Sequence, residues 1–180
     1  ADEGDFDFNV QLVKEHFDRN VRDNCSLDFY NSTIDLLDIE VESKYYLSER
    51  IKPTILSDGS AKFKSNSEID KLIARPLTAT MNKMHRACQD NYFSDLFIQS
   101  RGFDRPCTRM TKEELAKIAI RKLTPQEAFK LQGFSPQFVN NAQRGGVSNA
   151  ALYKQAGNAV SVNTIYAISH YLVTNLIIHE

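Results

Sequence analysis

The chain has 180 residues, of which 42% are hydrophobic and 25% are charged. These proportions are ordinary for a globular chain, and the length suggests one domain. No run approaches the roughly 18 apolar residues that a membrane span requires, which argues against a membrane partner. The three cysteines, Cys25, Cys88 and Cys107, are an odd number at unrelated spacings. They indicate reduced thiols and a cytoplasmic location instead of a disulfide framework.

The net charge of −1 conceals an uneven distribution along the chain. Residues 1–70 contain 8 Lys and Arg against 16 Asp and Glu, whereas residues 71–125 contain 11 against 5. Residues 126–180 are nearly balanced, with 3 against 2. The middle segment is therefore the one with the electrostatics to approach a phosphate backbone. A solvated charged face is the alternative explanation of its excess.

The acidic segment, residues 1–70, is expected to be mainly helical and to dock against another surface. Ser26 and Thr33 can cap helices, and the apolar residues between 34 and 41 need to be covered. Ser48 opens a short helical stretch over residues 49–56, and a turn cluster follows at residues 57–60.

The basic segment, residues 71–125, is expected to hold a small and irregular sheet. Residues 72–81 and 92–99 scatter β-branched and aromatic side chains among polar ones, which favours extended chain over helix. Helix signals return at Thr111, which forms a capping box with Glu114.

A second capping box, Thr-Pro-Gln-Glu at residues 124–127, predicts a helix that Gly133 ends. Ser135 and Pro136 can begin another, and residues 148–156 are expected to form a helix that Gly157 stops. A final helix over residues 162–178 would place four apolar side chains on one stripe that packs against an apolar surface: Ile165, Ile168, Leu172 and Leu176.

Three short strings occur in order near the C-terminal end of the sequence. They are Arg-x-Leu-Thr-Pro-x-Glu at residues 121–127, Leu-Gln-Gly-Phe at 131–134 and Tyr-x-Gln-x-Gly-Asn-x-Val at 153–160. Each alone is an ordinary helix start or stop. Their order and spacing together resemble motifs IX and X, the last two sequence blocks of cytosine-5 DNA methyltransferases. The resemblance covers at least residues 75–160 and loosely begins at residues 45–48.

The family's other blocks do not occur in these residues. The sequence contains no F-x-G-x-G cofactor block, no Pro-Cys-Gln nucleophile loop and no Glu-Asn-Val block. Pro106 and Cys107 echo the nucleophile loop, but Thr108 follows them and no acid block accompanies them, so Cys107 is interpreted as structural or incidental. The resemblance therefore implies no catalytic residue in these residues, and a nucleophile on a partner chain or on an N-terminal half of the same protein. The four histidines are too dispersed for a metal site.

Residues 75–80, Arg-Pro-Leu-Thr-Ala-Thr, resemble the family's target-recognition signature, with Pro76 where Thr is usual. Lys83, Arg86 and Arg101 are suited to contact phosphates or to read guanine, and the sequence does not decide between the two. Asn82, Gln89 and Asn91 are suited to read adenine or to position a strand. The resemblance implies eight DNA-contacting residues: Arg75, Leu77, Thr78, Thr80, Lys83, His85, Arg86 and Arg101. The alternative is a solvated loop.

The resemblance also assigns roles in motifs IX and X. Arg121 is expected to brace the recognition loops with Glu127 as its ionic partner, while Gln126 stands where the family usually has a second Arg. Motif X would lie beside the methionine end of S-adenosylmethionine, and Ala159 stands where many relatives carry Ser. The implied structural residues are Arg121, Thr124, Pro125, Glu127 and Gln155, and the implied cofactor-binding residues are Gly157, Asn158, Ala159 and Val160.

The resemblance implies an α+β fold in which a small, irregular recognition domain with short strands precedes helices that pack on a partner's α/β, Rossmann-like domain. Residues 121–180 would complete that catalytic domain. The chain is similar to the C-terminal part of a DNA (cytosine-5-)-methyltransferase of a restriction-modification system. It would be the DNA-recognition part of that enzyme, either as the small subunit of a two-chain enzyme or as a fragment of a longer chain. It would share S-adenosylmethionine with a catalytic chain and bind duplex DNA.

Two other functions are compatible with the same residues. One is a non-catalytic, sequence-specific DNA-binding module or regulator related to such enzymes. The other is a helical protein-interaction domain with chance matches. The motif X string at residues 153–160 favours the enzyme subunit, because a protein that only reads DNA has no use for it.

Overall fold

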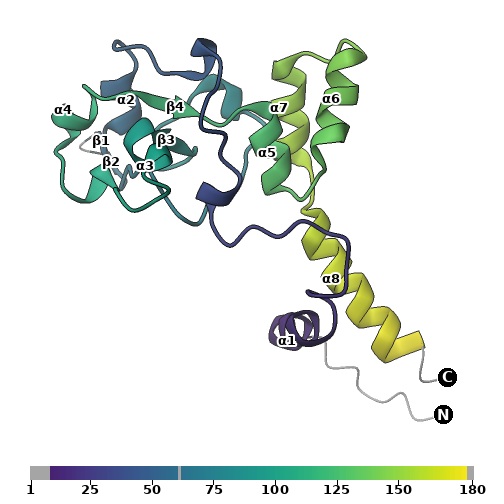
Figure 1. Ribbon diagram of the computed structural model, residues 1–180. Helices are drawn as coiled ribbons and strands as arrows, with labels where there is room; N and C mark the ends of the chain where they lie inside the picture. The colour runs from purple at the N-terminus through teal and green to yellow at the C-terminus, as the bar shows by residue number, and fades with distance from the viewer. Residues whose placement is uncertain (1–8, 61, 178–180) are drawn as a thin grey trace. The chain divides into compact units, whose positions relative to one another are not determined.

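The computed structural model describes residues 9–60 and 62–177, which form two compact units (Figure 1). Unit 1 combines residues from both ends of the chain, Ala1–Asp28 and Val160–Glu180. Unit 2 is the continuous stretch Phe29–Ala159. No helix in the described ranges is long and apolar enough to cross a membrane.

Unit 1 is a pair of packed helices, α1 (Val10–Asn20) and α8 (Val162–Leu172), with one π-helical turn, η5 (Val173–Ile177), after α8. Asn9 caps α1, since its Oδ1 accepts a hydrogen bond from the Gln11 amide at 2.7 Å. The helices meet at two imidazole rings, where His16 Nε2 lies 2.9 Å from His170 Nδ1. Tyr171 is buried against the His16 ring with an edge contact. The side chain of Leu176, which was predicted to lie on the apolar stripe of this final helix, is outside the described part of the structure.

The first part of unit 2 is only partly helical. It contains two 3-10 turns, η1 (Thr33–Asp35) and η2 (Ser43–Tyr45), and one short helix, α2 (Lys52–Leu56). The expectation of a mainly helical segment is therefore wrong, because residues 21–32, 36–42, 57–60 and 62–70 contain no helix. Leu36 and Leu37 are buried without a helix, because this irregular chain packs against the aromatic pair Phe93 and Phe97.

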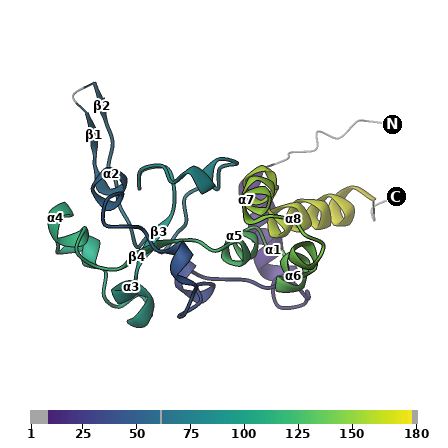
Figure 2. The same cartoon turned by 90° about the horizontal axis from the view of Figure 1, so that it is seen from above.

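Two small antiparallel sheets follow. The strands β1 (Gly59–Ser60) and β2 (Phe63–Lys64) form a hairpin that stands out from the rest of unit 2 (Figure 2). The second sheet pairs β3 (Tyr92–Ser94) with β4 (Ile120–Lys122), in a register that places Phe93 opposite Arg121. A short sheet is thus present in the middle segment, as the sequence indicated, but its second strand is Ile120–Lys122, whereas residues 72–81 form no strand.

The residues after β3 differ from the prediction. Residues 92–99 were expected to be extended, but α3 (Asp95–Gln99) begins directly after the strand. Ser94 explains the change, because its Oγ accepts a hydrogen bond from the Phe97 amide at 3.2 Å and caps the helix. The remaining short elements of this segment are η3 (Met81–Lys83), η4 (Pro106–Thr108) and α4 (Lys112–Leu115).

Three helices complete unit 2: α5 (Pro125–Leu131), α6 (Pro136–Arg144) and α7 (Asn149–Asn158). Both predicted capping boxes are formed, at the starts of α4 and α5. Gly133, with φ +81°, follows α5 as expected. One helix end was predicted wrongly, because α7 continues through Gly157 to Asn158. Phe129, Val139 and Leu152 join the three helices in one buried core.

Candidate nucleic-acid interface

A fully buried ion pair lies at the centre of unit 2. Arg121 and Glu127 have no exposed side-chain surface, and they form two parallel hydrogen bonds, from Nη1 to Oε2 at 2.9 Å and from Nη2 to Oε1 at 2.8 Å. Glu127 also accepts from the backbone amides of Thr124, at 2.7 Å, and Asp38, at 2.8 Å. Arg121 donates to the Asp38 carbonyl oxygen at 2.8 Å. The pair therefore joins β4, the start of α5 and the irregular chain around Asp38.

A second buried carboxylate fixes the beginning of the recognition segment, the basic residues 71–125 that carry the predicted target-recognition signature. Asp70 is fully buried with φ +58°, and its two oxygens accept from the amide and the hydroxyl of Ser94 at 2.7 and 2.9 Å. Burial raises the pKa of Asp70 to about 6. Arg105 Nε donates to the Asp70 carbonyl oxygen at 3.1 Å. These bonds attach the chain before residue 75 to β3.

Arg75 is held by bonds to the backbone. Its Nε donates to the Ala87 carbonyl oxygen at 3.0 Å, and its Nη2 lies 3.4 Å from the carbonyl oxygen of Glu68. The side-chain amide of Asn91 bonds both the amide and the carbonyl oxygen of Arg75, at 2.8 and 3.0 Å. Asn91 thus fixes the backbone at Arg75, and the two roles expected for it, reading adenine or positioning a strand, stay predictions.

Four of the eight predicted DNA-contacting residues lie around one pocket. Arg75, Thr78, Thr80 and His85 line it with Pro76, Cys88 and Gln89. Cys88 was not recognised as a site residue from the sequence, because nothing beside it in the chain suggests such a role. Thr78 lines the pocket, but its hydroxyl oxygen is buried beneath the surface and has no hydrogen-bond partner among the described residues.

The other four predicted residues are distributed differently. Leu77 is half-buried and packs against two apolar cores, so its side chain serves packing. Lys83 and Arg101 are exposed and Arg86 is half-buried. In residues 9–60 and 62–177 none of these three cations is within ion-pair distance of a carboxylate.

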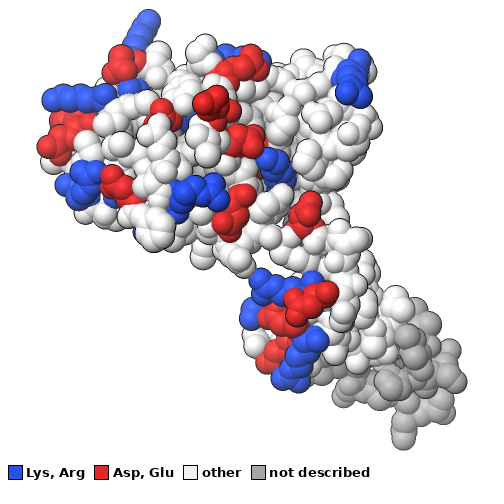
Figure 3. Space-filling model, in the orientation of Figure 1, with Lys and Arg blue, Asp and Glu red and all other residues white. Residues whose placement is uncertain are grey.

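Most other cations of the middle segment are paired within the chain. Lys71 and Arg105 both pair with Glu68, at 3.2 Å each, and Arg109 pairs with Asp104 at 2.8 Å. Lys112 pairs with Asp58 and Arg121 with Glu127. Figure 3 shows the same mixing, with basic and acidic side chains side by side on unit 2. The positive excess of the sequence is thus partly neutralised by carboxylates of the acidic segment, such as Glu68 and Asp58.

Motif X packs directly on the recognition segment. A Cβ atom at Gly157 would lie 2.2 Å from the carbonyl carbon and oxygen of Thr78 and 2.3 Å from the Ala79 nitrogen. The glycine is therefore needed inside α7, where it admits this backbone. Gln132 secures the same end of α7, since its Nε2 donates to the carbonyl oxygens of Ala156 at 2.9 Å and Ala159 at 3.3 Å.

A shallow pocket lies at this junction, lined by Arg75, Pro76, Leu77, Gln132, Gly157 and Ala159 among others. Of the other predicted motif X residues, Asn158 and Gln155 are exposed, and Val160 is 63% exposed. The close approach expected of Gly157 is made here to the recognition segment of the same chain. A cofactor contact by these residues stays a prediction.

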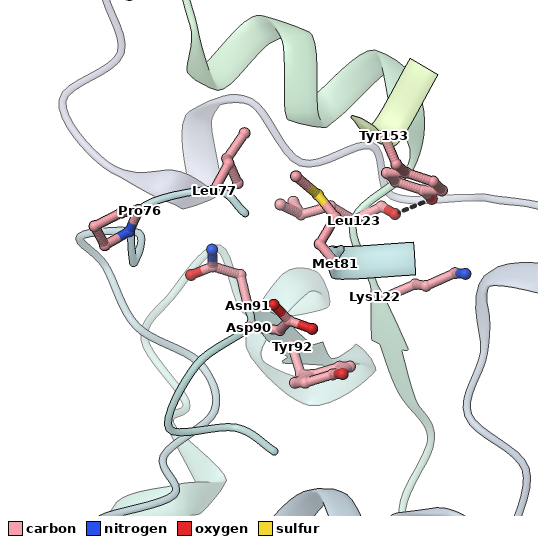
Figure 4. Close-up of a pocket in the computed structure, with 9 residues that line it drawn as sticks. All are labelled: Pro76, Leu77, Met81, Asp90, Asn91, Tyr92, Lys122, Leu123 and Tyr153. Atoms are coloured by element: carbon pink, nitrogen blue, oxygen red, sulfur yellow. Dashed lines mark hydrogen bonds between the residues drawn. The ribbon is translucent and has the colours of Figure 1, made fainter. Parts of the chain in front are cut away.

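A narrower pocket connects the recognition segment to motif IX (Figure 4). Lys122 and Tyr153 lie on one side of it, with the Lys122 Nζ 5.1 Å from the centre of the Tyr153 ring. The Tyr153 hydroxyl donates to the Leu123 carbonyl oxygen at 2.6 Å, a bond drawn in Figure 4. Burial lowers the pKa of Lys122. Sequence reasoning missed both residues as a contact pair, since thirty positions separate them along the chain.

Cys107 does not have the surroundings of a nucleophile. It is half-buried against the apolar core that includes Leu47 and Ile120. Burial raises the pKa of its thiol, which disfavours the reactive thiolate. Its interpretation as a structural residue agrees with this environment.

Comparisons with known proteins give the family. A family described as C-5 cytosine-specific DNA methylase matches residues 8–174. The chain is 40% identical over 67 residues to the orphan methyltransferase M.SPRI of Bacillus phage SPR, a match that covers 37% of this chain and 15% of that protein. It is 38% identical over 82 residues to the type II methyltransferase M.HpaII of Haemophilus parainfluenzae, covering 46% and 22%. The chain thus spans less than a quarter of either relative.

Two solved structures share the fold. The Entamoeba histolytica methyltransferase EhMeth aligns with a TM-score of 0.62 and 20% identity, over 83% of this chain and 42% of that one. The S. pombe Dnmt2 methyltransferase aligns with a TM-score of 0.65 and 16% identity, over 94% and 49%. Since the family match extends over nearly the whole sequence and includes the buried Arg121–Glu127 pair and the Gly157 contact, the chain belongs to the C-5 cytosine-specific DNA methylase family.

Proposed function

We propose that this chain is the DNA-recognition part of a DNA (cytosine-5-)-methyltransferase that acts on a specific duplex sequence, within a restriction-modification system. The observation that carries the proposal is the contact between Gly157 and the Thr78–Ala79 backbone. It joins the recognition signature to motif X inside one compact unit. A protein that only reads DNA has no use for that connection.

The catalytic groups must come from another polypeptide segment. The 180 residues contain no Pro-Cys-Gln and no Glu-Asn-Val string, and the thiol of Cys107 is half-buried with a raised pKa. A cytosine can be attacked only after it leaves the duplex, at a cost of a few kcal/mol. This chain would hold the opened duplex by its recognition segment, while a partner carrying the Pro-Cys motif supplies the nucleophile and the acid.

The residues of motif X fit one edge of a site for S-adenosylmethionine, which supplies the methyl group when bound. Asn158 exposes its side-chain amide at the end of α7. Gly157 is closed on one side by Thr78 and Ala79, and Ala159 offers a methyl group where a hydroxyl is usual in the family. The rest of the site would belong to the partner, so the isolated chain is expected to bind the cofactor weakly.

The surface of α8 supports a protein partner. The helix, VNTIYAISHYL, contains no Asp, Glu, Lys or Arg. Ile165 is 49% exposed and Tyr166 39% exposed, and Val173 in the following turn is 45% exposed. Neighbouring apolar side chains that face water on a charge-free helix are typical of a protein interface. We propose that this face packs on the catalytic domain.

The experiment is a methyl-transfer assay with tritiated S-adenosylmethionine and mixed-sequence duplex DNA. The chain is assayed alone and together with a polypeptide that carries the missing catalytic motifs. Label in cytosine with the mixture, and none with either protein alone, is the expected result. Label with the chain alone would contradict the proposal that the catalytic groups come from another polypeptide. Salt-sensitive DNA binding by the chain, with no label in any mixture, would instead identify a non-catalytic DNA-binding module.

A further inference from the structure

The pocket around His85 has the composition of an anion site. Arg75 provides a permanent positive charge, and no Asp or Glu side chain of the described ranges lines the pocket. Hydroxyl, imidazole and amide groups make up the remaining polar lining: Thr78, Thr80, His85 and Gln89. This set is rich in donors and lacks negative charge. It favours a ligand that is an anion with several acceptor oxygens.

Asp90 holds His85 in one orientation. Its Oδ2 accepts from the His85 amide at 2.9 Å and lies 3.2 Å from His85 Nδ1. An ionised carboxylate only accepts, so Nδ1 carries a hydrogen and Nε2 is the nitrogen left for a ligand. The Tyr92 hydroxyl donates to the His85 carbonyl oxygen at 2.6 Å, which fixes the backbone as well. Asp90 is buried and is not among the residues that line this pocket.

The charge of Arg75 points to a ligand. Its Nε and Nη2 donate to backbone carbonyl oxygens, and in the described ranges no carboxylate lies within ion-pair distance of its guanidinium. An oxyanion in the pocket would balance this charge.

We infer that this pocket binds a phosphodiester of duplex DNA, and that Asp90 is a positioning residue that aims His85 at the phosphate. The inference rests on the proposed function for the source of the phosphate, and it goes beyond that function in naming the bound group and the residues that hold it. With a phosphate oxygen on one side and Asp90 on the other, both nitrogens of the His85 ring act as donors. Free phosphate would meet the same donors, so the experiment separates the two sources.

Cys88 provides a first test, because its half-buried thiol lines the pocket whereas Cys25 lies in unit 1. The full chain is alkylated with iodoacetamide in the presence of duplex DNA, inorganic phosphate or chloride at equal ionic strength. The rate at each cysteine is followed by mass spectrometry. Duplex DNA is expected to slow alkylation of Cys88 in proportion to its occupancy, while Cys25 keeps its rate.

A second test locates the phosphate. Duplexes in which one phosphate at a time is replaced by a neutral methylphosphonate are bound to the parent chain and to His85→Ala. A hydrogen bond to a charged group corresponds to roughly tenfold in affinity or more. For the parent chain, replacing one particular phosphate should lower the affinity for the duplex by about that factor. For His85→Ala, replacing the same phosphate should lower the affinity no further. For Lys117→Ala, which removes an exposed cation outside the pocket, the replacement should lower the affinity as much as it does for the parent.

Asp90 is tested with two variants. Asp90→Asn retains an oxygen that accepts from Nδ1, so replacing the critical phosphate should still lower its affinity for the duplex in part. Asp90→Ala retains no such oxygen, so the same replacement should leave its affinity unchanged. A merely structural role would lower affinity equally for every duplex. Additive losses at all phosphates, with unchanged alkylation of Cys88, would overturn the inference and leave the proposed function standing. Protection of Cys88 by inorganic phosphate alone would overturn the DNA assignment, and a parent chain that binds no duplex would overturn the proposed function as well.

Discussion

At the scale of single residues, the Arg121–Glu127 ion pair stands out in unit 2 because both of its side chains are fully buried. Glu127→Gln leaves the Arg121 guanidinium buried without a counter-charge, which typically costs about 3–5 kcal/mol of unfolding free energy. The matched control is Lys130→Ala, which breaks the more exposed pair between Lys130 and Asp38 and should cost about 1 kcal/mol or less. Urea denaturation followed by circular dichroism measures both. Equal costs would contradict the structural role given to the buried pair.

Gly157 is constrained by space and not by backbone angle. Gly157→Ala places a methyl group within 2.2 Å of the Thr78 backbone, so α7 and the recognition segment must separate. We expect a loss of about 1–3 kcal/mol, the usual range for overpacking, together with amide chemical-shift changes at Thr78 and Ala79. Gly145→Ala is the control, because its Cβ would meet only ordinary contacts at 3.4 Å and beyond. A Gly157→Ala variant with the stability of the parent would refute the close packing of α7 on the Thr78 backbone.

Asp70 makes stability depend on pH in a defined direction. Its folded-state pKa, about 6, lies above the ordinary value of 3.8. The contribution of Asp70 to the free energy of unfolding is therefore fully present below about pH 4 and is lost as the pH rises through 6. Asp70→Asn removes this ionisation, and asparagine tolerates the positive φ at this position. The stability of the variant relative to the parent should therefore rise by about 2–3 kcal/mol between pH 4 and pH 7. Urea melts across that range check this, and a constant difference would count against it.

At the scale of elements, the two capping boxes offer a comparison of one motif in two environments. The box of α4 is exposed at Thr111, whereas that of α5 is buried at Thr124 and shares Glu127 with Arg121. Thr124→Ala should cost about 2 kcal/mol, since it leaves a buried amide without its acceptor, and Thr111→Ala about 0.5–1 kcal/mol. Thermal melts of the two variants test the ranking. A larger effect at Thr111 would reverse it.

Local signals in the sequence predicted the helical elements with the fewest errors. The boxes at Thr111 and Thr124 give the starts of α4 and α5, because cap, Pro and carboxylate act within four residues. The end of α7 was misplaced, since the reason for Gly157 is a contact with residues nearly eighty positions away. Residues 36–42 were misjudged for the same reason: their structure is set by packing on Phe93 and Phe97.

In the candidate site, too, local patterns in the sequence were informative, whereas contacts formed only on folding were not foreseen. Thr78, Thr80 and His85 were identified from the signature and the residues after it, and the structure brings them to one pocket. Asp90 was missed because its pairing with His85 leaves no recognisable spacing. The basic excess of residues 71–125 was a poorer guide, since ion pairs with Glu68 and Asp58 form only when the acidic segment folds against it.

At the scale of the whole molecule, the exposed apolar face of α8 predicts how the chain associates. Ile165→Asp puts a charge into the proposed interface and should weaken binding to a catalytic polypeptide by at least about tenfold, because a buried unpaired charge is costly. Thr164→Asp, also exposed on α8, is the control for added charge on the helix. Isothermal titration calorimetry measures both affinities. Equal affinity of Ile165→Asp and the parent would exclude this face.

The contact at Gly157 also bears on how target choice can change in this family. Gly157 meets the recognition segment through backbone atoms of Thr78 and Ala79, which are the nearest atoms to the place that a Cβ of residue 157 would take. This contact therefore does not depend on the identity of the Thr78 and Ala79 side chains. Substitutions at those two positions, by natural drift or by design, can change the side chains of the segment while the backbone contact to α7 is kept.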